Sequence, residues 1–148
     1  MPIPVLNDHG LLPEGLHLCS LDELQERFGQ FQISARRPTL FRKFTELVHE
    51  IRATGLVTWL VVDGSFVTAK PEPEDVDLIL VLSETHNFAA ELRPFEYNVL
   101  SRKRVRRRYN FDVLIAREHS VELQEYLAFF QQVRGETEFR KGLLKVLP

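Results

Sequence analysis

Two carboxylates separated by one residue stand at the start of a long apolar run. They are Asp75 and Asp77, and all residues from 76 to 82 except Asp77 are aliphatic. A run of this kind predicts a buried strand, and alternate side chains of a strand share one face, with their Cα atoms roughly 7 Å apart. Because such carboxylates need water or a cation within reach, the spacing predicts a pair of metal ligands. Surface acids at the entry to a strand are the alternative interpretation.

A third carboxylate, Asp112, lies in a second strand-like segment, residues 109–115. If this segment lies beside the first, Asp112 joins Asp75 and Asp77 in one cluster. Like charges about 4 Å apart cost on the order of 1 kcal/mol per pair in water and about 4 kcal/mol near a protein surface, so three carboxylates require a cation. Carboxylate oxygens are hard ligands, and the pattern includes no histidine or cysteine, which favours Mg²⁺ or Mn²⁺.

The dipeptide Gly64-Ser65 follows another apolar segment, residues 57–62, and forms the turn out of it. An ordinary strand-to-helix turn is one explanation. In the other, the missing glycine Cβ lets a phosphate approach the backbone, and the amide and hydroxyl of Ser65 donate hydrogen bonds to it at a helix start. Lys70, between this turn and the acids, is a further candidate for a phosphate contact.

The order and spacing of these residues resemble a known superfamily. Gly64-Ser65, nine intervening residues, then Asp75-Val76-Asp77 and later Asp112 are similar to the motif of the DNA polymerase beta-type nucleotidyltransferases, in particular their minimal single-domain members. The match covers residues 62–115, and the flanks resemble a small bacterial family of nucleotidyltransferase-like proteins without assigned function. Asp63 departs from the superfamily pattern, which usually has an apolar residue there, and places a fourth acid near the site.

The resemblance implies transfer of a nucleoside monophosphate from a nucleoside triphosphate such as ATP to a hydroxyl on a protein or RNA. Two divalent cations would assist this transfer. The resemblance also implies a partner protein, as in a toxin–antitoxin pair. The implied catalytic residues and metal ligands are Asp75, Asp77 and Asp112, and the implied nucleotide contacts are Gly64 and Ser65, with Lys70 as a further candidate.

A concentrated basic segment precedes Asp112. Six of the seven residues from Arg102 to Arg108 are lysine or arginine. A solvated loop is one explanation, and a rim that binds the phosphates of a nucleotide or an RNA acceptor is the other, because arginine grips phosphate with two parallel hydrogen bonds. If the segment extends the strand that follows it, Arg104, Arg106 and Arg108 share a face and are the expected contacts.

Size and composition favour one domain in a cytoplasmic protein. The chain has 148 residues, 44% of them hydrophobic, a formal net charge of −2 and one cysteine. This length predicts a single domain, in which residues 1–35 form an arm and a short helix and residues 36–148 form the catalytic core. One cysteine allows no internal disulfide and no thiolate zinc cluster. No apolar run approaches the roughly 20 residues of a membrane span.

Apolar periodicity and chain breakers predict an α/β (α+β) fold, a nucleotidyltransferase-like mixed sheet packed with helices. Three strands, 57–62, 76–82 and 109–115, are expected to be neighbours. A short strand at 15–19 and a final strand or helical turn at 141–147 are further candidates. The expected helices are 20–28, opened by a capping box of Ser20 and Glu23, a second from Pro38 to Gly55, a short one at 65–70, 88–100 with a kink or late start at Pro94, and one after Ser120.

Three functions remain open from sequence. The leading hypothesis is the nucleotidyltransferase, the second is a non-catalytic module of the same fold that binds nucleotide, RNA or a partner protein, and the third is a metal-dependent phosphodiesterase. Too few residues follow Asp112 for the helical domain that often holds the base and acceptor in larger relatives. A second subunit, from a partner protein or a homo-oligomer, would then complete the pocket.

Overall fold

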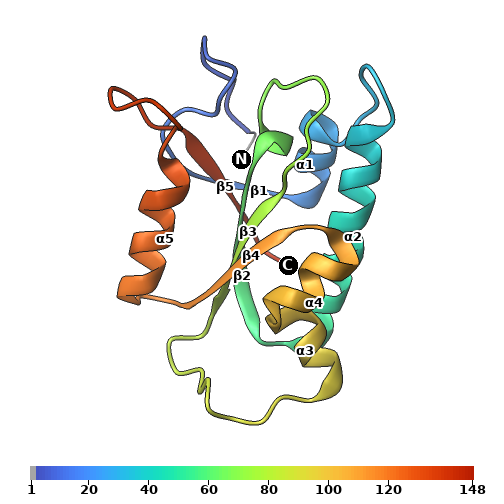
Figure 1. Ribbon diagram of the computed structural model, residues 1–148, viewed down its shortest axis with the longest axis vertical. Helices are drawn as coiled ribbons and strands as arrows, with labels where there is room; N and C mark the ends of the chain where they lie inside the picture. Colours follow the sequence, from blue (N-terminus) through green and yellow to red (C-terminus); the bar gives the residue numbers. More distant parts are fainter. Residues whose placement is uncertain (1–2) are drawn as a thin grey trace.

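The computed structural model describes residues 3–148 and contains one five-stranded mixed sheet between helices (Figure 1). In spatial order the strands are β1 (Gly15–Cys19), β5 (Gly142–Val146), β2 (Val57–Asp63), β3 (Asp77–Leu82) and β4 (Asp112–Arg117). Strands β1 and β5 are parallel, β3 and β4 are parallel, and β2 runs antiparallel to both of its neighbours, β5 and β3. The predicted mixed α/β fold is confirmed, and so is the adjacency of the three strands that carry or precede the acids.

Local capping signals account for the helix boundaries. The Ser20 side chain accepts from the Glu23 amide, and Glu23 caps in return, as the capping box predicts. Gly55 ends the second helix in the left-handed conformation at φ 64°. The third helix begins at Pro94, where a missing N–H costs nothing. The helices are α1 (Leu21–Phe28), α2 (Arg36–Thr54), α3 (Pro94–Leu100), α4 (Arg102–Tyr109) and α5 (Val121–Gln131), with a 3₁₀ turn at Ser65–Val67.

Both faces of the central strands are buried. Helices α1 to α4 cover one face and α5 covers the other (Figure 1). On the α5 face, Val61 of β2 and Ile79 of β3 pack with Leu123 and Phe130 of α5. Since side chains alternate along a strand, a residue two positions from Val61 or Ile79 belongs to this same face.

Two segments differ from the sequence-based prediction. The basic segment is the helix α4, because the Ser101 hydroxyl caps it and Val105 and Tyr109, four residues apart, are its buried positions. In a helix, a residue is rotated by about 200° about the helix axis from the residue two positions before it. Arg106 therefore lies on the opposite side from Arg104 and Arg108, and the prediction that all three share one face is wrong. The strand predicted to begin at 109 begins at Asp112, after Asn110 turns the chain at φ 62°.

The remaining differences are shorter elements than predicted. Residues 88–93 are not helical, the segment after Gly64 forms one 3₁₀ turn, and β3 begins at Asp77. β3 begins one residue after the predicted start at 76, and the chain just before it is held away from the ladder, because the backbone of Asp75 hydrogen-bonds to Ser65 and Phe66. Among residues 3–148, no helix is both long and apolar enough to cross a membrane.

Candidate active site

Three aspartates lie side by side across the sheet, at the end where β2 finishes and β3 and β4 begin. Asp63, the last residue of β2, is in register with Asp77, the first residue of β3, and Asp77 is in register with Asp112, the first residue of β4. Paired residues of neighbouring strands point to the same face, and the alternation places this face on the α5 side. We call Asp63, Asp77 and Asp112 the acid row.

Asp75 lies beside the acid row and outside β3. Its backbone N–H donates to Ser65 Oγ at 3.0 Å, and its carbonyl accepts from the Phe66 N–H at 3.1 Å. Its carboxylate is close enough to raise the pKa of both Asp63 and Asp77. The structure therefore brings the three predicted acids to one end of the sheet, with Asp63 in the register position next to Asp77.

The turn at Gly64-Ser65 binds the loop that carries Asp75. Gly64 has φ 96°, and a Cβ there would lie 2.6 Å from the Asp75 carbonyl oxygen. Ser65 Oγ accepts from the N–H groups of Glu74 and Asp75, at 2.9 and 3.0 Å. The close approach of the Asp75 carbonyl is therefore enough to require glycine at position 64, without any bound phosphate. The Ser65 hydroxyl retains its proton for donation to a ligand.

A buried arginine holds the next residues of this loop in place. Arg37 on α2 is 1% exposed and donates to the carbonyls of Phe28, Phe66, Thr68 and Lys70, at 3.2, 2.6, 2.8 and 2.6 Å. Its burial lowers the pKa of the guanidinium. The backbone of Lys70 is thereby fixed beside the turn, and its side chain is exposed. An arginine immediately before Pro38 carries no sequence signal for such a role.

Lys141 provides a counter-ion for the buried end of the acid row. Its Nζ lies 2.9 Å from Oδ1 of Asp63, whose side chain is 4% exposed. Burial raises the pKa of Asp63 and outweighs the opposing effect of Lys141. Lys141 directly precedes β5, which is paired with β2, so the ion pair follows from the pairing of two strands that are distant in sequence.

Asp77 occupies the centre of the acid row, and its surroundings perturb its acidity. Burial is the largest cause, and the carboxylates of Asp63, Asp112 and Asp75 add to it, so that the pKa of Asp77 rises from 3.8 to about 6. Lys141 opposes this rise. A carboxylate repelled by its neighbours in this way is a favourable position for a cation.

The exposed end of the acid row has an arginine partner. Arg106 on α4 forms an ion pair with Asp112, and both side chains are more than half exposed. Arg104 hydrogen-bonds to Asn98, and Arg108 pairs with a glutamate on α2. Of the three arginines predicted as phosphate contacts, the structure brings only Arg106 to the acids.

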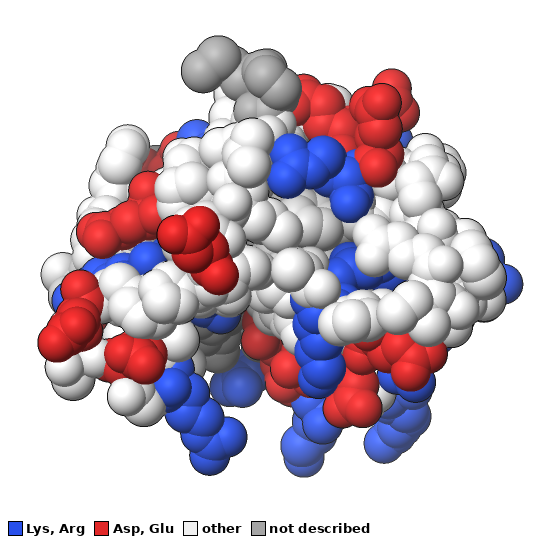
Figure 2. Space-filling model, turned by 90° about the horizontal axis from the view of Figure 1, so that it is seen from above, with Lys and Arg blue, Asp and Glu red and all other residues white. Residues whose placement is uncertain are grey.

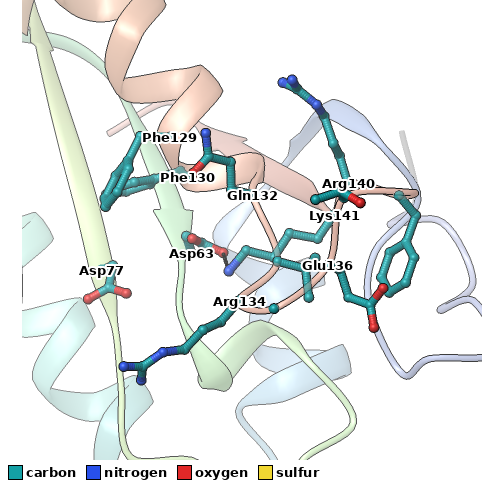
Figure 3. Close-up of a pocket in the computed structure, with 13 residues that line it drawn as sticks. Asp63, Asp77, Phe129, Phe130, Gln132, Arg134, Glu136, Arg140 and Lys141 are labelled. Atoms are coloured by element: carbon teal, nitrogen blue, oxygen red, sulfur yellow. Dashed lines mark ion pairs between the residues drawn. The ribbon is translucent and has the colours of Figure 1, made fainter.

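A pocket of about 1100 Å³ opens beside the acid row, between the end of α5 and the loop 132–141 (Figure 3). The loop is closed like a hairpin, because Gln132 and Arg140 form an isolated bridge and the Lys141 N–H donates to the Gln131 carbonyl at 2.9 Å. Residues that line the pocket include Asp63, Asp77, Phe129, Phe130, Arg134 and Lys141.

The N-terminal arm connects this hairpin loop to the loop after Gly64. The His9 ring stacks on Phe139 with centroids 4.2 Å apart, and the Ala69 N–H donates to the Gly10 carbonyl at 2.9 Å. Both sides of the site are therefore held by one segment. Figure 2 looks onto this end of the molecule and shows acidic and basic side chains interspersed over it.

Carboxylate oxygens are suitable ligands for a hard divalent cation, but Asp112 and Asp63 are already paired with Arg106 and Lys141. Within residues 3–148, no three His, Cys, Asp or Glu side chains are arranged to hold a metal ion. Strands lie about 4.8 Å apart, so the row spans about 10 Å and a single ion cannot reach both ends. Asp75, Asp77 and Asp112 are the set that could share an ion, once Asp112 leaves Arg106.

The family comparison covers nearly the whole chain. A family model described as "Family of unknown function (DUF6932)" matches residues 4–147. The chain belongs to this family. No curated protein and no solved structure is significantly similar to the chain. The matched range includes the acid row, the turn at Gly64 and the hairpin loop, so the whole candidate site lies within the DUF6932 region.

Several residues of the site are not signalled by the sequence. Lys141 and Arg37 act through tertiary contacts, and Phe129 and Arg134 line the pocket from α5 and the hairpin loop. The one sequence clue is Asp63, a fourth acid directly before Gly64. Its pairing with Asp77 depends on strand register.

Proposed function

We propose that this protein is a metal-dependent nucleotidyltransferase that moves a nucleoside monophosphate from a nucleoside triphosphate to a hydroxyl on a protein or RNA. The observation that carries the proposal is the register of Asp77 and Asp112 on adjacent strands, with Asp75 beside them and a pocket of about 1100 Å³ at the row. The sequence resemblance of this motif to the nucleotidyltransferase superfamily supports the same reaction.

The reaction replaces one phosphorus–oxygen bond by another. The acceptor oxygen attacks the α-phosphorus, the bond to the β-phosphate oxygen breaks, and pyrophosphate leaves. Asp112 is the proposed acceptor of the hydroxyl proton. A bound divalent cation supplies charge neutralisation on the phosphates and lowers the pKa of the attacking hydroxyl.

The residues of the chain have distinct proposed tasks. Asp75, Asp77 and Asp112 hold the cation, either Mg²⁺ or Mn²⁺. The Ser65 hydroxyl donates a hydrogen bond to a phosphate oxygen, and Lys70 contributes a positive charge at the loop that Arg37 fixes. Arg106 balances Asp112 while no cation is bound, and then becomes available to a phosphate.

The test is transfer of labelled nucleotide. Purified protein is incubated with each α-labelled nucleoside triphosphate and Mg²⁺ or Mn²⁺, with a cell extract as the source of acceptor. We expect label on RNA or protein, its loss in Asp77→Asn, and its retention in Glu91→Gln, which changes an exposed acid in the loop between β3 and α3. Shortened RNA without incorporated label would instead indicate a phosphodiesterase.

A non-catalytic module that binds nucleotide, RNA or a partner protein is the second candidate. It is favoured by the ion pairs that Arg106 and Lys141 make with the two ends of the acid row, because such partners compete with a metal. Binding of nucleotide without transfer to any acceptor, in the presence of either cation, would select this candidate. The partner implied by a toxin–antitoxin pair would then be the molecule to seek.

A further inference from the structure

The pocket beside the acid row has two features that the proposed chemistry does not use. One is an exposed aromatic ring, Phe129, and the other is a cationic side chain, Arg134. Both face the same cavity as Asp63 and Asp77 (Figure 3). The cavity, about 1100 Å³, is slightly larger than the roughly 300–1,000 Å³ typical of small-ligand pockets.

Phe129 is not needed to attach α5 to the sheet. Leu123 and Phe130 bury their side chains in the core on this face, and Phe130 is only 8% exposed. Phe129, by contrast, is 64% exposed, with its ring 6.2 Å from that of Phe130. Leaving a phenylalanine in water forgoes roughly 1.5–3 kcal/mol of burial. A planar ligand stacked on the ring would recover part of this free energy.

Arg134 is placed by the hairpin loop and has no counter-ion among residues 3–148. The loop turns at Gly135, which has φ 81°, and the Glu136 N–H donates to the Val133 carbonyl at 3.0 Å. From this turn Arg134 extends toward the side of the pocket where Asp77 lies (Figure 3). An arginine held near carboxylates without pairing with them is suited to an anion that arrives together with a cation.

We infer that this pocket is the binding site of the nucleoside triphosphate, with the base stacked on Phe129 and the phosphates between Arg134 and the acid row. This inference rests on the proposed function. It adds a site for the base, which the glycine-serine turn and the acids do not provide. An aromatic platform, an arginine and Asp77, one of the three proposed cation ligands, line this pocket, and together they are the complement of a metal–nucleotide complex. Because stacking on a phenyl ring tolerates every base, the four nucleoside triphosphates should bind with similar affinity.

Calorimetric titration with Mg²⁺ and the α,β-methylene analogue of ATP, which cannot be cleaved at the reacting bond, tests the inference. We expect Phe129→Ala to weaken binding on the order of 10-fold, from the roughly 1–3 kcal/mol of a base–aromatic stack, and Phe129→Tyr to restore it. Arg134→Gln should weaken binding by a similar factor. The matched controls are Val121→Ala, an exposed apolar residue at the other end of α5, and Arg107→Gln on α4.

Inorganic tripolyphosphate with Mg²⁺ separates the two contacts, since it has phosphates but no base. Arg134→Gln should weaken its binding, and Phe129→Ala should leave it unchanged. Thermal melting of each variant establishes that the fold is intact. Wild-type affinity for the analogue in both variants would overturn the inference, and so would an equal loss of tripolyphosphate binding in both. It would also be overturned if the wild type bound none of the four nucleotides.

The outcomes for this site and for the proposed reaction are separable. Analogue binding that depends on Phe129 and Arg134, without transfer of label to any acceptor, would retain the subsite and refute the nucleotidyltransferase. If the protein transfers label but its binding of the analogue does not depend on Phe129 or Arg134, the reaction would be retained and the subsite refuted.

Discussion

Replacing Asp77 with asparagine removes the charge at the centre of the acid row and keeps the shape of the side chain. The pKa of Asp77 is raised from 3.8 to about 6 by burial and by the neighbouring carboxylates. At 1.36 kcal/mol per pKa unit this corresponds to roughly 3 kcal/mol. Since Asp77 is half-buried and solvent screens part of the repulsion, we expect about 1–2 kcal/mol.

The sign of the effect depends on pH. The folded protein prefers neutral Asp77, so wild-type stability is complete below pH 4 and falls as the pH rises through about 6. The asparagine variant has no charge to acquire and does not lose this stability. In metal-free buffer at pH 8 the variant should therefore melt roughly 3–6 °C above the wild type, and near pH 4 the difference should vanish.

Thermal melting in the presence of a chelator, followed by circular dichroism from pH 4 to 8, measures this difference. Adding Mg²⁺ at pH 8 should raise the melting temperature of the wild type and leave Asp77→Asn unchanged, because the central ligand is missing. The control Glu91→Gln should follow the wild type at every pH. A variant that melts lower than the wild type at pH 8 without metal would show that Asp77 stabilises the fold, and the argument from repulsion would be refuted.

Three further predictions concern residues that support the site. Gly64→Ala places a Cβ at φ 96° and 2.6 Å from the Asp75 carbonyl, and should cost roughly 3 kcal/mol or more in urea unfolding; a loss under about 1 kcal/mol would contradict the close approach. Arg37→Met leaves four carbonyls without their donor and should also cost roughly 3 kcal/mol or more, whereas an unchanged unfolding midpoint would contradict its role as a clamp. Burial raises the pKa of the Cys19 thiol to about 12, so a disulfide reagent at pH 8 should label it slowly in the native protein and quickly in urea. Rapid labelling of the native protein would show that the thiol is accessible.

Local pattern was sufficient for most elements of the fold. The apolar runs at 57–62 and 76–82 predict strands that are buried on both faces, and in the structure they are the paired strands β2 and β3. The capping box at Ser20 and the stop at Gly55 act within one helical turn, so they are readable from neighbouring residues. The position of Asp112 beside Asp77 followed once the two strands were taken as neighbours.

The basic segment shows where local pattern is ambiguous. Arg104 and Arg106 flank Val105 with the alternation of a strand, while Val105 and Tyr109 have the spacing of a helix face. The Ser101 cap and the packing that buries Val105 and Tyr109 together select the helix. The consequence for the site is large, because one arginine reaches Asp112 and the other two turn to α3 and α2.

The sequence by itself determined which residue types the site contains, namely closely spaced carboxylates after a glycine-serine turn, because such spacing is a property of the local chain. The tertiary structure decided their partners. Asp63 meets Asp77 through antiparallel register, and Lys141 meets Asp63 through the pairing of β5 with β2. Contacts of this kind join segments far apart along the chain, and no short-range pattern encodes them because they depend on the order and direction of strands in the sheet.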